Sequence, residues 1–213
     1  MVQGGGATCR PFAMRLAVLI TLATLAQAGA ASATCPTAAD LSTGGVTLVQ
    51  NEPFFLRSDY EVTENRLTEV RLFKQDGQNR QRIVNYAHGL APLTETLPEG
   101  LVQITYAAAL EPLDRIQTEG AVVLDAKRLG PKRGLDDMQV AFRFVGARDM
   151  VIQSCRYRVL DVEETVVLSG DVASRRTVAF APDLGLILSA HTNVGTGETF
   201  AYSWIGTAAD IAR

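Results

Sequence analysis

Hydrophobic and polar side chains alternate along most of this chain, in short runs separated by turn residues. Between positions 138 and 144 every second residue is a large apolar one, and the same period of two occurs at 102–106, 155–159 and 199–204. This period is typical of a β-strand that buries one of its faces. The pattern therefore predicts a chain built mainly from strands.

Turn residues divide these runs at short intervals. The pair Asp76-Gly77 predicts a tight hairpin between 69–74 and 80–86. Further turns are predicted at 146–149, 169–171, 182–183 and 193–197, where Gly, Asp, Ser, Asn or Pro separate two alternating runs. Consecutive strands joined by short turns form an antiparallel meander.

The predicted fold class is therefore mainly β with little helix. We expect an antiparallel meander of about nine to eleven strands, arranged as a sandwich or as a partly closed (half) barrel. Helix is expected only as single turns at Pro36–Leu41 and Thr207–Ala212, and 109–113 is ambiguous.

The first 33 residues have the organisation of a secretory signal peptide. Arg10 and Arg15 flank an apolar run, Leu16–Ala30, and Ala31-Ser32-Ala33 fits the small-x-small rule for cleavage. The run is too short, and too rich in Ala and Thr, for a membrane anchor. We expect cleavage after residue 33, with Met14 as an alternative start, and one periplasmic or secreted β-rich domain over 34–213.

Cleavage leaves 18 basic and 23 acidic residues, a net charge of −5. A mildly acidic chain lacks the basic surface that a phosphate backbone requires, so nucleic acid is not an expected partner. No second apolar stretch approaches membrane-spanning length, so no transmembrane segment is expected in the mature chain.

Cys35 and Cys155 remain once Cys9 has left with the signal peptide. An even pair in an oxidising compartment predicts a disulfide, and Cys155 shares an apolar face with Tyr157 and Val159, which suits a buried bridge. We disfavour two alternatives. Lipidation of Cys35 fits badly because Thr34 departs from the lipoprotein pattern, and a catalytic thiol at Cys155 has no recognisable basic partner.

Three other stretches are candidates for binding. Asp161 and Glu163 share one side of a strand and could hold a cation, but Glu164 on the other face favours a solvated strand crossing or bulge. The basic stretch 127–134 is either an exposed loop or a contact for an anionic surface. The aromatic stripe is either core or the lining of a ligand groove, which makes its residues the candidate ligand-lining set: Phe200, Tyr202 and Trp204.

Catalytic motifs are missing from the sequence. His88 and His191 are expected as surface residues at strand ends, and they do not have the spacing of zinc ligands. There is no nucleophile elbow, phosphate loop or dinucleotide fingerprint. No catalytic, cofactor-binding or metal-binding residue is therefore predicted.

Two motifs carry a resemblance: Cys155-Arg156-Tyr157 on a strand, and the later turn and strand FAPDLGL, residues 180–186. Over roughly residues 150–190 the chain resembles secreted bacterial β-rich proteins of unknown function. The resemblance implies an envelope β-domain that is distantly similar to the half-barrels that carry lipoproteins or lipids through the periplasm. Those carriers begin with a sizeable amphipathic helix, whereas only a short helical turn follows Cys35 here. The resemblance assigns no functional residue to any position of this chain.

The sequence as a whole predicts a secreted periplasmic protein that is not an enzyme. It would bind an apolar ligand or support the cell envelope, because a half-barrel leaves a concave apolar face. The alternative is a protein-interaction or assembly factor whose partner is an envelope protein, and a hydrolase is the third hypothesis.

Overall fold

The computed structural model describes Met1 and residues 34–75, 77–132, 134–195 and 199–211. The signal peptide predicted at 1–33 lies outside the described residues apart from Met1. The strands are β1 (Val46–Gln50), β2 (Leu56–Thr63), β3 (Arg66–Gln75), β4 (Gln78–His88), β5 (Ala91–Leu97), β6 (Gly100–Tyr106), β7 (Ala121–Gly130), β8 (Gly134–Ile152), β9 (Cys155–Leu168), β10 (Asp171–Ala181), β11 (Leu186–Gly195), β12 (Phe200–Ala201) and β13 (Trp204–Thr207). The helices are α1 (Ala38–Thr43), η1 (Glu111–Arg115), α2 (Ile116–Glu119) and α3 (Ala208–Ile211).

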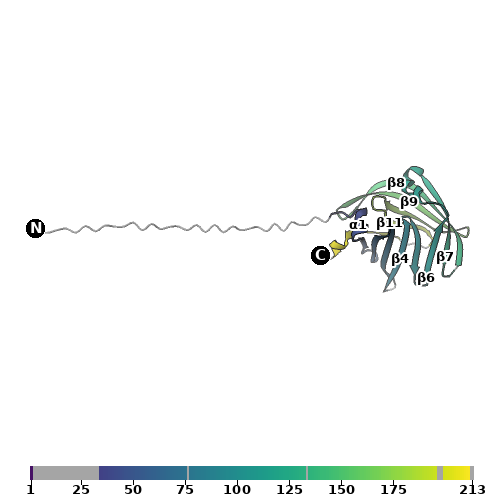
Figure 1. Cartoon of the computed structure of the whole chain (residues 1–213), viewed down its shortest axis with the longest axis horizontal. Coiled ribbons are helices and arrows are strands. Elements are labelled where there is room, and N and C mark those ends of the chain that lie inside the picture. The colour runs from purple at the N-terminus through teal and green to yellow at the C-terminus, as the bar shows by residue number, and fades with distance from the viewer. Residues whose placement is uncertain (2–33, 76, 133, 196–198, 212–213) are drawn as a thin grey trace. The chain divides into compact units, whose positions relative to one another are not determined.

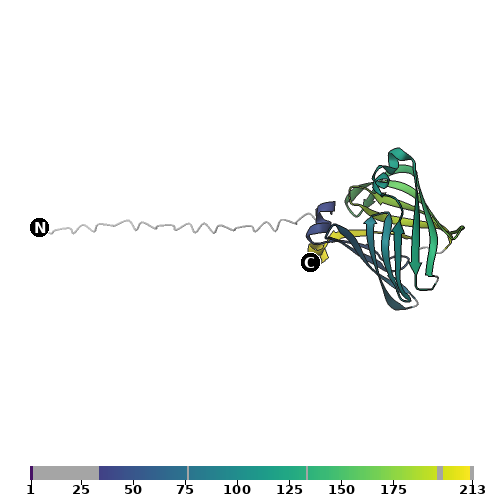
Figure 2. The same cartoon turned by 45° about the vertical axis from the view of Figure 1, so that its right-hand side comes forward.

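All the described strands belong to one antiparallel sheet. They follow one another in chain order from β1 to β12, and β13 pairs with the other edge of β1. The sheet curves round an interior instead of stacking on a second sheet, as Figures 1 and 2 show. The predicted meander and partly closed barrel are therefore confirmed, with more strands than expected, and the sandwich does not form.

The two ends of the sheet, β12 and β13, are separated in the chain only by Tyr202 and Ser203. Tyr202 donates its backbone N–H to the Leu188 carbonyl oxygen of β11 at 3.2 Å, and Ser203 donates to the Val49 carbonyl oxygen of β1 at 2.9 Å. One short segment thus contacts both edges, although no ladder joins β12 to β13. The strand predicted at 198–204 is for this reason two short strands on opposite edges.

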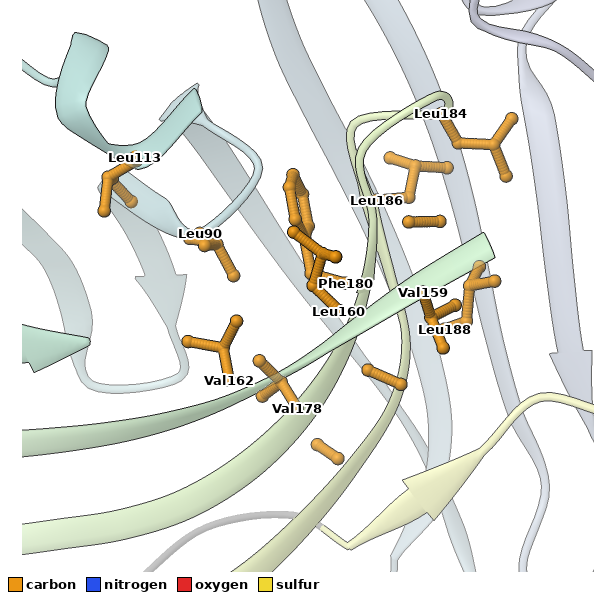
Figure 3. Packing of buried hydrophobic residues seen from close by; sticks show 14 of the residues in the cluster. Leu90, Leu113, Val159, Leu160, Val162, Val178, Phe180, Leu184, Leu186 and Leu188 are labelled. Atoms are coloured by element: carbon orange, nitrogen blue, oxygen red, sulfur yellow. The ribbon is translucent and has the colours of Figure 1, made fainter. Parts of the chain in front are cut away.

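Buried aliphatic side chains gather at the end of the barrel that carries α1 and the β2–β3, β4–β5, β8–β9 and β10–β11 turns, among them Leu41, Leu90, Leu113, Ile116 and Leu184. A Cβ atom on Gly89 would collide with the carbonyl oxygen of Gly185, so the β4–β5 and β10–β11 turns touch across this end. Figure 3 shows part of the cluster, with side chains from η1, the β4–β5 turn, β9, β10, the β10–β11 turn and β11. We call this cluster the aliphatic core.

The predicted disulfide between Cys35 and Cys155 is formed, with Cα atoms 5.4 Å apart. Cys155, Tyr157 and Val159 are all buried, as their alternation predicted. The Tyr157 hydroxyl also donates to the Pro36 carbonyl oxygen at 3.2 Å. Both contacts hold the segment before α1 against β9.

The turn predicted at 146–149 is wrong. β8 runs through these residues to Ile152, and the chain reverses at Gln153-Ser154, where Gln153 has a φ of 54°. A register shift against β9 between Phe144 and Gly146 marks a β-bulge. Gly146 therefore belongs to a bulge within the long β8–β9 hairpin. Glycine is common in both bulges and turns, so the residue types at 146–149 did not distinguish the two.

Candidate functional site

A cluster of charged and hydroxyl side chains lies inside the barrel, on β2, β3 and β4. The fully buried Glu69 carboxylate accepts hydrogen bonds at 2.6 Å from the hydroxyl groups of Ser58 and Tyr86. Arg71 donates to the same carboxylate through Nε at 2.8 Å and Nη2 at 3.1 Å. The Tyr202 hydroxyl lies 2.6 Å from Ser58 Oγ and connects the C-terminal segment to the cluster. We call these five residues the interior ion-pair cluster.

A second ion pair crosses from β9 to β10. Arg176 donates to the buried Glu164 carboxylate through Nε at 3.0 Å and Nη2 at 2.8 Å, which is the two-pronged geometry that arginine and carboxylate groups favour. The sequence pattern predicted a solvated strand crossing or bulge at these acidic residues. The prediction is wrong for Glu164, because the arginine that neutralises its carboxylate lies on the neighbouring strand, twelve residues away in the chain.

Glu69 and Arg71 carry the charges of the interior ion-pair cluster at neutral pH. Burial by itself raises the pKa of Glu69, but the charge and hydrogen bonds of Arg71 and the hydroxyl donors outweigh it and hold this pKa below its ordinary value. Burial, together with the charge of Glu69, raises the pKa of Tyr86 well above its ordinary value. A carboxylate saturated by donors is a poor general base, so the cluster serves the fold and offers no acid–base chemistry.

A cavity of about 530 Å³ lies among the tips of the β5–β6, β7–β8 and β9–β10 hairpins. In a meander these tips are at the opposite end from the aliphatic core. The apolar part of the lining comes from Leu97, Pro131, Leu168 and Val172. The charged part comes from Glu99, Arg128, Lys132 and Asp171. We call this the mouth cavity, and its volume is within the range of small-molecule binding sites.

Charged side chains at the mouth cavity form ion pairs with one another and with neighbouring strands. Lys132 Nζ donates to Glu99 Oε1 at 2.9 Å, and Arg128 Nη1 lies 3.9 Å from Asp136 Oδ2. Its described lining contains neither histidine nor cysteine, and the Ser169 hydroxyl in the lining donates to Asp136 Oδ1 at 3.4 Å. Across the described residues, no three His, Cys, Asp or Glu side chains are grouped so that they could hold a metal ion.

The predicted ligand-lining residues lie elsewhere. Phe200 and Tyr202 are buried with ring centroids 5.0 Å apart, and Phe200 packs 5.3 Å from the Arg71 guanidinium. Trp204 is only half-buried. The chain crosses to the other edge of the sheet at Ser203, so Trp204 does not continue the strand of Phe200. None of the three is among the described residues that line the mouth cavity. Their contact with a ligand remains a prediction.

The two other sequence candidates lie at different places: the carboxylate pair is on the outer surface, and the basic stretch reaches the mouth cavity. Asp161 and Glu163 pair with Arg148 at 2.9 Å and Arg143 at 3.1 Å, so each carboxylate has its own cation. The basic stretch 127–134 begins inside β7, and its tip at Pro131 and Lys132 borders the mouth cavity. Sequence reasoning found this stretch through its charge but gave no signal of the cavity.

His88 is not the surface residue that the sequence predicted. Its side chain is 12% exposed, its Nδ1 accepts the Leu90 N–H at 3.1 Å, and its ring centroid lies 5.4 Å from that of Phe180. Burial lowers the pKa of His88, and Asp114 at 3.4 Å from Nε2 opposes this only in part. His88 is therefore a neutral core residue, whereas His191 is exposed on β11.

Because the pKa of His88 is depressed in the folded state, the unfolded chain binds its proton more readily. The stability that neutral His88 contributes is fully present above the ordinary pKa of 6.5. It is lost as the pH falls through the lower pKa of the folded state. We expect the urea midpoint to decrease from pH 8 to pH 5, and a His88→Gln variant to lose part of this dependence. The exposed His191→Gln variant should keep it. An unchanged pH profile in His88→Gln would contradict the assignment.

Three leucines are exposed on the outer face next to the β7–β8 tip. Leu129 pairs with Leu135 across the hairpin, Leu101 lies on the adjacent β6, and their exposed fractions are 46%, 67% and 48%. Contiguous exposed apolar side chains are typical of contact surfaces. The alternative function as an interaction factor remains a prediction with this patch as its candidate surface.

Comparisons with known proteins add a fold-level similarity. No family model matches the chain, and no curated protein matches its sequence. Among solved structures, the chain is similar to the hypothetical lipoprotein YmcC from Escherichia coli K12, with a TM-score of 0.42 and 10% identity over 76% of this chain and 83% of that chain. No helix within the described residues has the length and apolar character needed to cross a membrane. Neither ligand nor activity is transferred from this similarity.

Proposed function

We propose that this protein is an envelope or secreted binding protein, not an enzyme, that holds a ligand with a substantial apolar part in the mouth cavity. The observation that carries the proposal is the cavity itself. It combines about 530 Å³ of space with apolar side chains from three hairpins at the end of the barrel opposite α1. Small-molecule sites typically combine such an apolar lining with a few placed polar groups.

The remaining interior argues for this position within the barrel. The interior ion-pair cluster and the aliphatic core occupy the middle and the far end with packed side chains. A ligand that threaded the whole barrel would have to displace these ion pairs, which costs several kcal/mol. The ligand would therefore be held at the hairpin tips and not enclosed as in a large lipid carrier.

The proposed location has two supports. The predicted signal peptide directs the chain out of the cytoplasm, and the Cys35–Cys155 disulfide suits an oxidising compartment.

The proposal predicts that a charge on the apolar lining abolishes most of the binding. We expect Val172→Asp to weaken binding of the neutral probe N-phenyl-1-naphthylamine at least tenfold, because ligand contact would desolvate the new carboxylate. Val172 is 47% exposed, so the substitution should leave the fold intact. Titration of probe fluorescence and native mass spectrometry of the purified protein measure the effect.

Val123→Asp is the matched control, because Val123 is 58% exposed on β7 and does not line the mouth cavity. It should bind the probe like the wild type. Equal weakening in both variants, or a wild type that binds no apolar probe, would contradict the proposed function.

A further inference from the structure

Arg128 differs from the other cation of the mouth cavity in its hydrogen bonding. Lys132 donates to a carboxylate at 2.9 Å. The Arg128 side chain is 24% exposed, and the nearest acid in the described part of the chain is Asp136, at 3.9 Å, beyond hydrogen-bond distance. Among the described residues no hydrogen bond from the guanidinium is formed, although it borders the cavity. Arg128 therefore presents donor groups that the fold leaves unused.

A mostly buried guanidinium without hydrogen bonds is unfavourable, because it has lost water without gaining acceptors. Its planar fork matches the two oxygens of a carboxylate or a phosphate group. The natural complement to this side chain is thus an anionic oxygen that enters through the mouth cavity. The carboxylates nearby do not use these donors: Glu99 is bound to Lys132, and Asp136 forms an ion pair with Arg128 at 3.9 Å, which balances the charge without a hydrogen bond. Within the described residues the buried Asp136 Oδ2 itself accepts no hydrogen bond, so the guanidinium donors stay open to a ligand.

Gly130 is what allows the guanidinium to lie there. A Cβ atom added to Gly130 would be 2.9 Å from Arg128 Nη1 and 3.5 Å from Cζ, so the arginine head is folded across the glycine. Any larger residue at position 130 would push the head aside. Since the atoms affected are the far end of a flexible side chain, that displacement would move the charge without breaking the strand.

We propose that the ligand of the mouth cavity is an anionic amphiphile, whose carboxylate or phosphate head is bound by Arg128 across Gly130 while its apolar chain lies against Leu97, Leu168 and Val172. This inference rests on the proposed function and specifies its ligand class. Long-range electrostatic attraction of the anion does not contribute to this binding, because the cations and carboxylates that line the mouth cavity nearly balance. Recognition comes from local two-pronged contact.

Four ligands with the same twelve-carbon chain test the head group: dodecanoate, dodecyl phosphate, dodecanol and dodecylamine. Calorimetry below their aggregation limits should show both anions binding the wild type at least tenfold more tightly than dodecanol. Arg128→Gln should remove this preference and leave dodecanol binding unchanged. Equal affinity for all four would leave the proposed function standing and overturn the anionic head, and a preference for dodecylamine would overturn it as well.

The glycine supplies a variant that keeps the arginine. Gly130→Ala should weaken binding of both anions about threefold to tenfold through displacement of the guanidinium. Gly146→Ala is the matched control, because a Cβ atom there meets nothing within 4 Å, and it should bind like the wild type. Thermal midpoints check that each variant is folded. Unchanged anion binding in both Gly130→Ala and Arg128→Gln would refute the role of Arg128.

Short anions separate the two proposals. Acetate and inorganic phosphate should bind far more weakly than their twelve-carbon counterparts. If they bind as tightly, and Arg128→Gln abolishes that binding, the anion site is real but the apolar-ligand function falls. If none of the twelve-carbon compounds and neither short anion binds, both proposals fall.

Discussion

Breaking the Cys35–Cys155 disulfide is expected to lower the free energy of unfolding by about 4 kcal/mol. The two cysteines are 120 positions apart, so the bond restricts a large part of the unfolded chain, and the chain-entropy argument gives about 4–5 kcal/mol for such a loop. Measured losses for native disulfides are about 2–5 kcal/mol. The effect is large because it acts on the unfolded state and not on one contact.

Reduction of the wild-type protein is the cleanest measurement, because both sulfur atoms stay in place while the bond is lost. Urea unfolding with and without a reducing agent should show a lower midpoint and a smaller extrapolated free energy for the reduced form. Tyr157→Phe serves as a comparison, since it removes only the hydrogen bond to Pro36 and should cost about 1 kcal/mol. A reduced protein as stable as the oxidised one would show that the N-terminal segment is held by packing alone.

Replacement of Glu69 by glutamine is expected to destabilise the protein by about 3–5 kcal/mol. The amide nearly preserves the shape of the side chain but removes the negative charge to which the buried Arg71 donates through Nε and Nη2. Removing one partner of a buried ion pair typically costs this much, because the remaining charge is neither hydrated nor neutralised. Denaturant unfolding measures the loss.

Two further variants isolate the cause. Replacing both Glu69 and Arg71 by methionine should cost less than Glu69→Gln alone, because no unpaired charge remains inside the barrel. Asp149→Asn breaks an exposed ion pair with Arg156 at 3.0 Å and should change stability by less than about 1 kcal/mol. A double variant less stable than Glu69→Gln would mean that packing at these positions outweighs their charges.

β3 shows why the interior ion-pair cluster was not predictable. In this strand Glu69 and Arg71 are buried inside the barrel, while Val70 and Leu72 face outward and are only half-covered. Alternation in a sequence shows that two faces differ, and hydrophobicity would assign the valine and the leucine to the interior. The ion pair reverses this assignment, because the donors that stabilise Glu69 come from other strands as well as its own.

The single strand predicted at the C-terminal aromatic stripe is divided into two strands for a related reason. Phe200, Tyr202 and Trp204 have the spacing of a single strand, and Phe200 and Tyr202 do share the buried face. The chain then leaves one sheet edge for the other at Ser203, so Trp204 begins a strand paired with β1. Nothing local marks this crossing, because it depends on where the first and the last long strands meet.

The sequence by itself determined the β meander, the scarcity of helix and the pairing of Cys35 with Cys155. Each depends on short-range pattern or on cysteine number, and these are properties of the chain before it folds. Only the tertiary structure decided the ion pairs inside the barrel, the contact of one segment with both sheet edges, and the mouth cavity with Arg128 folded across Gly130. These features require side chains from strands distant in sequence, and their positions are fixed only when the sheet has curled and its register is set.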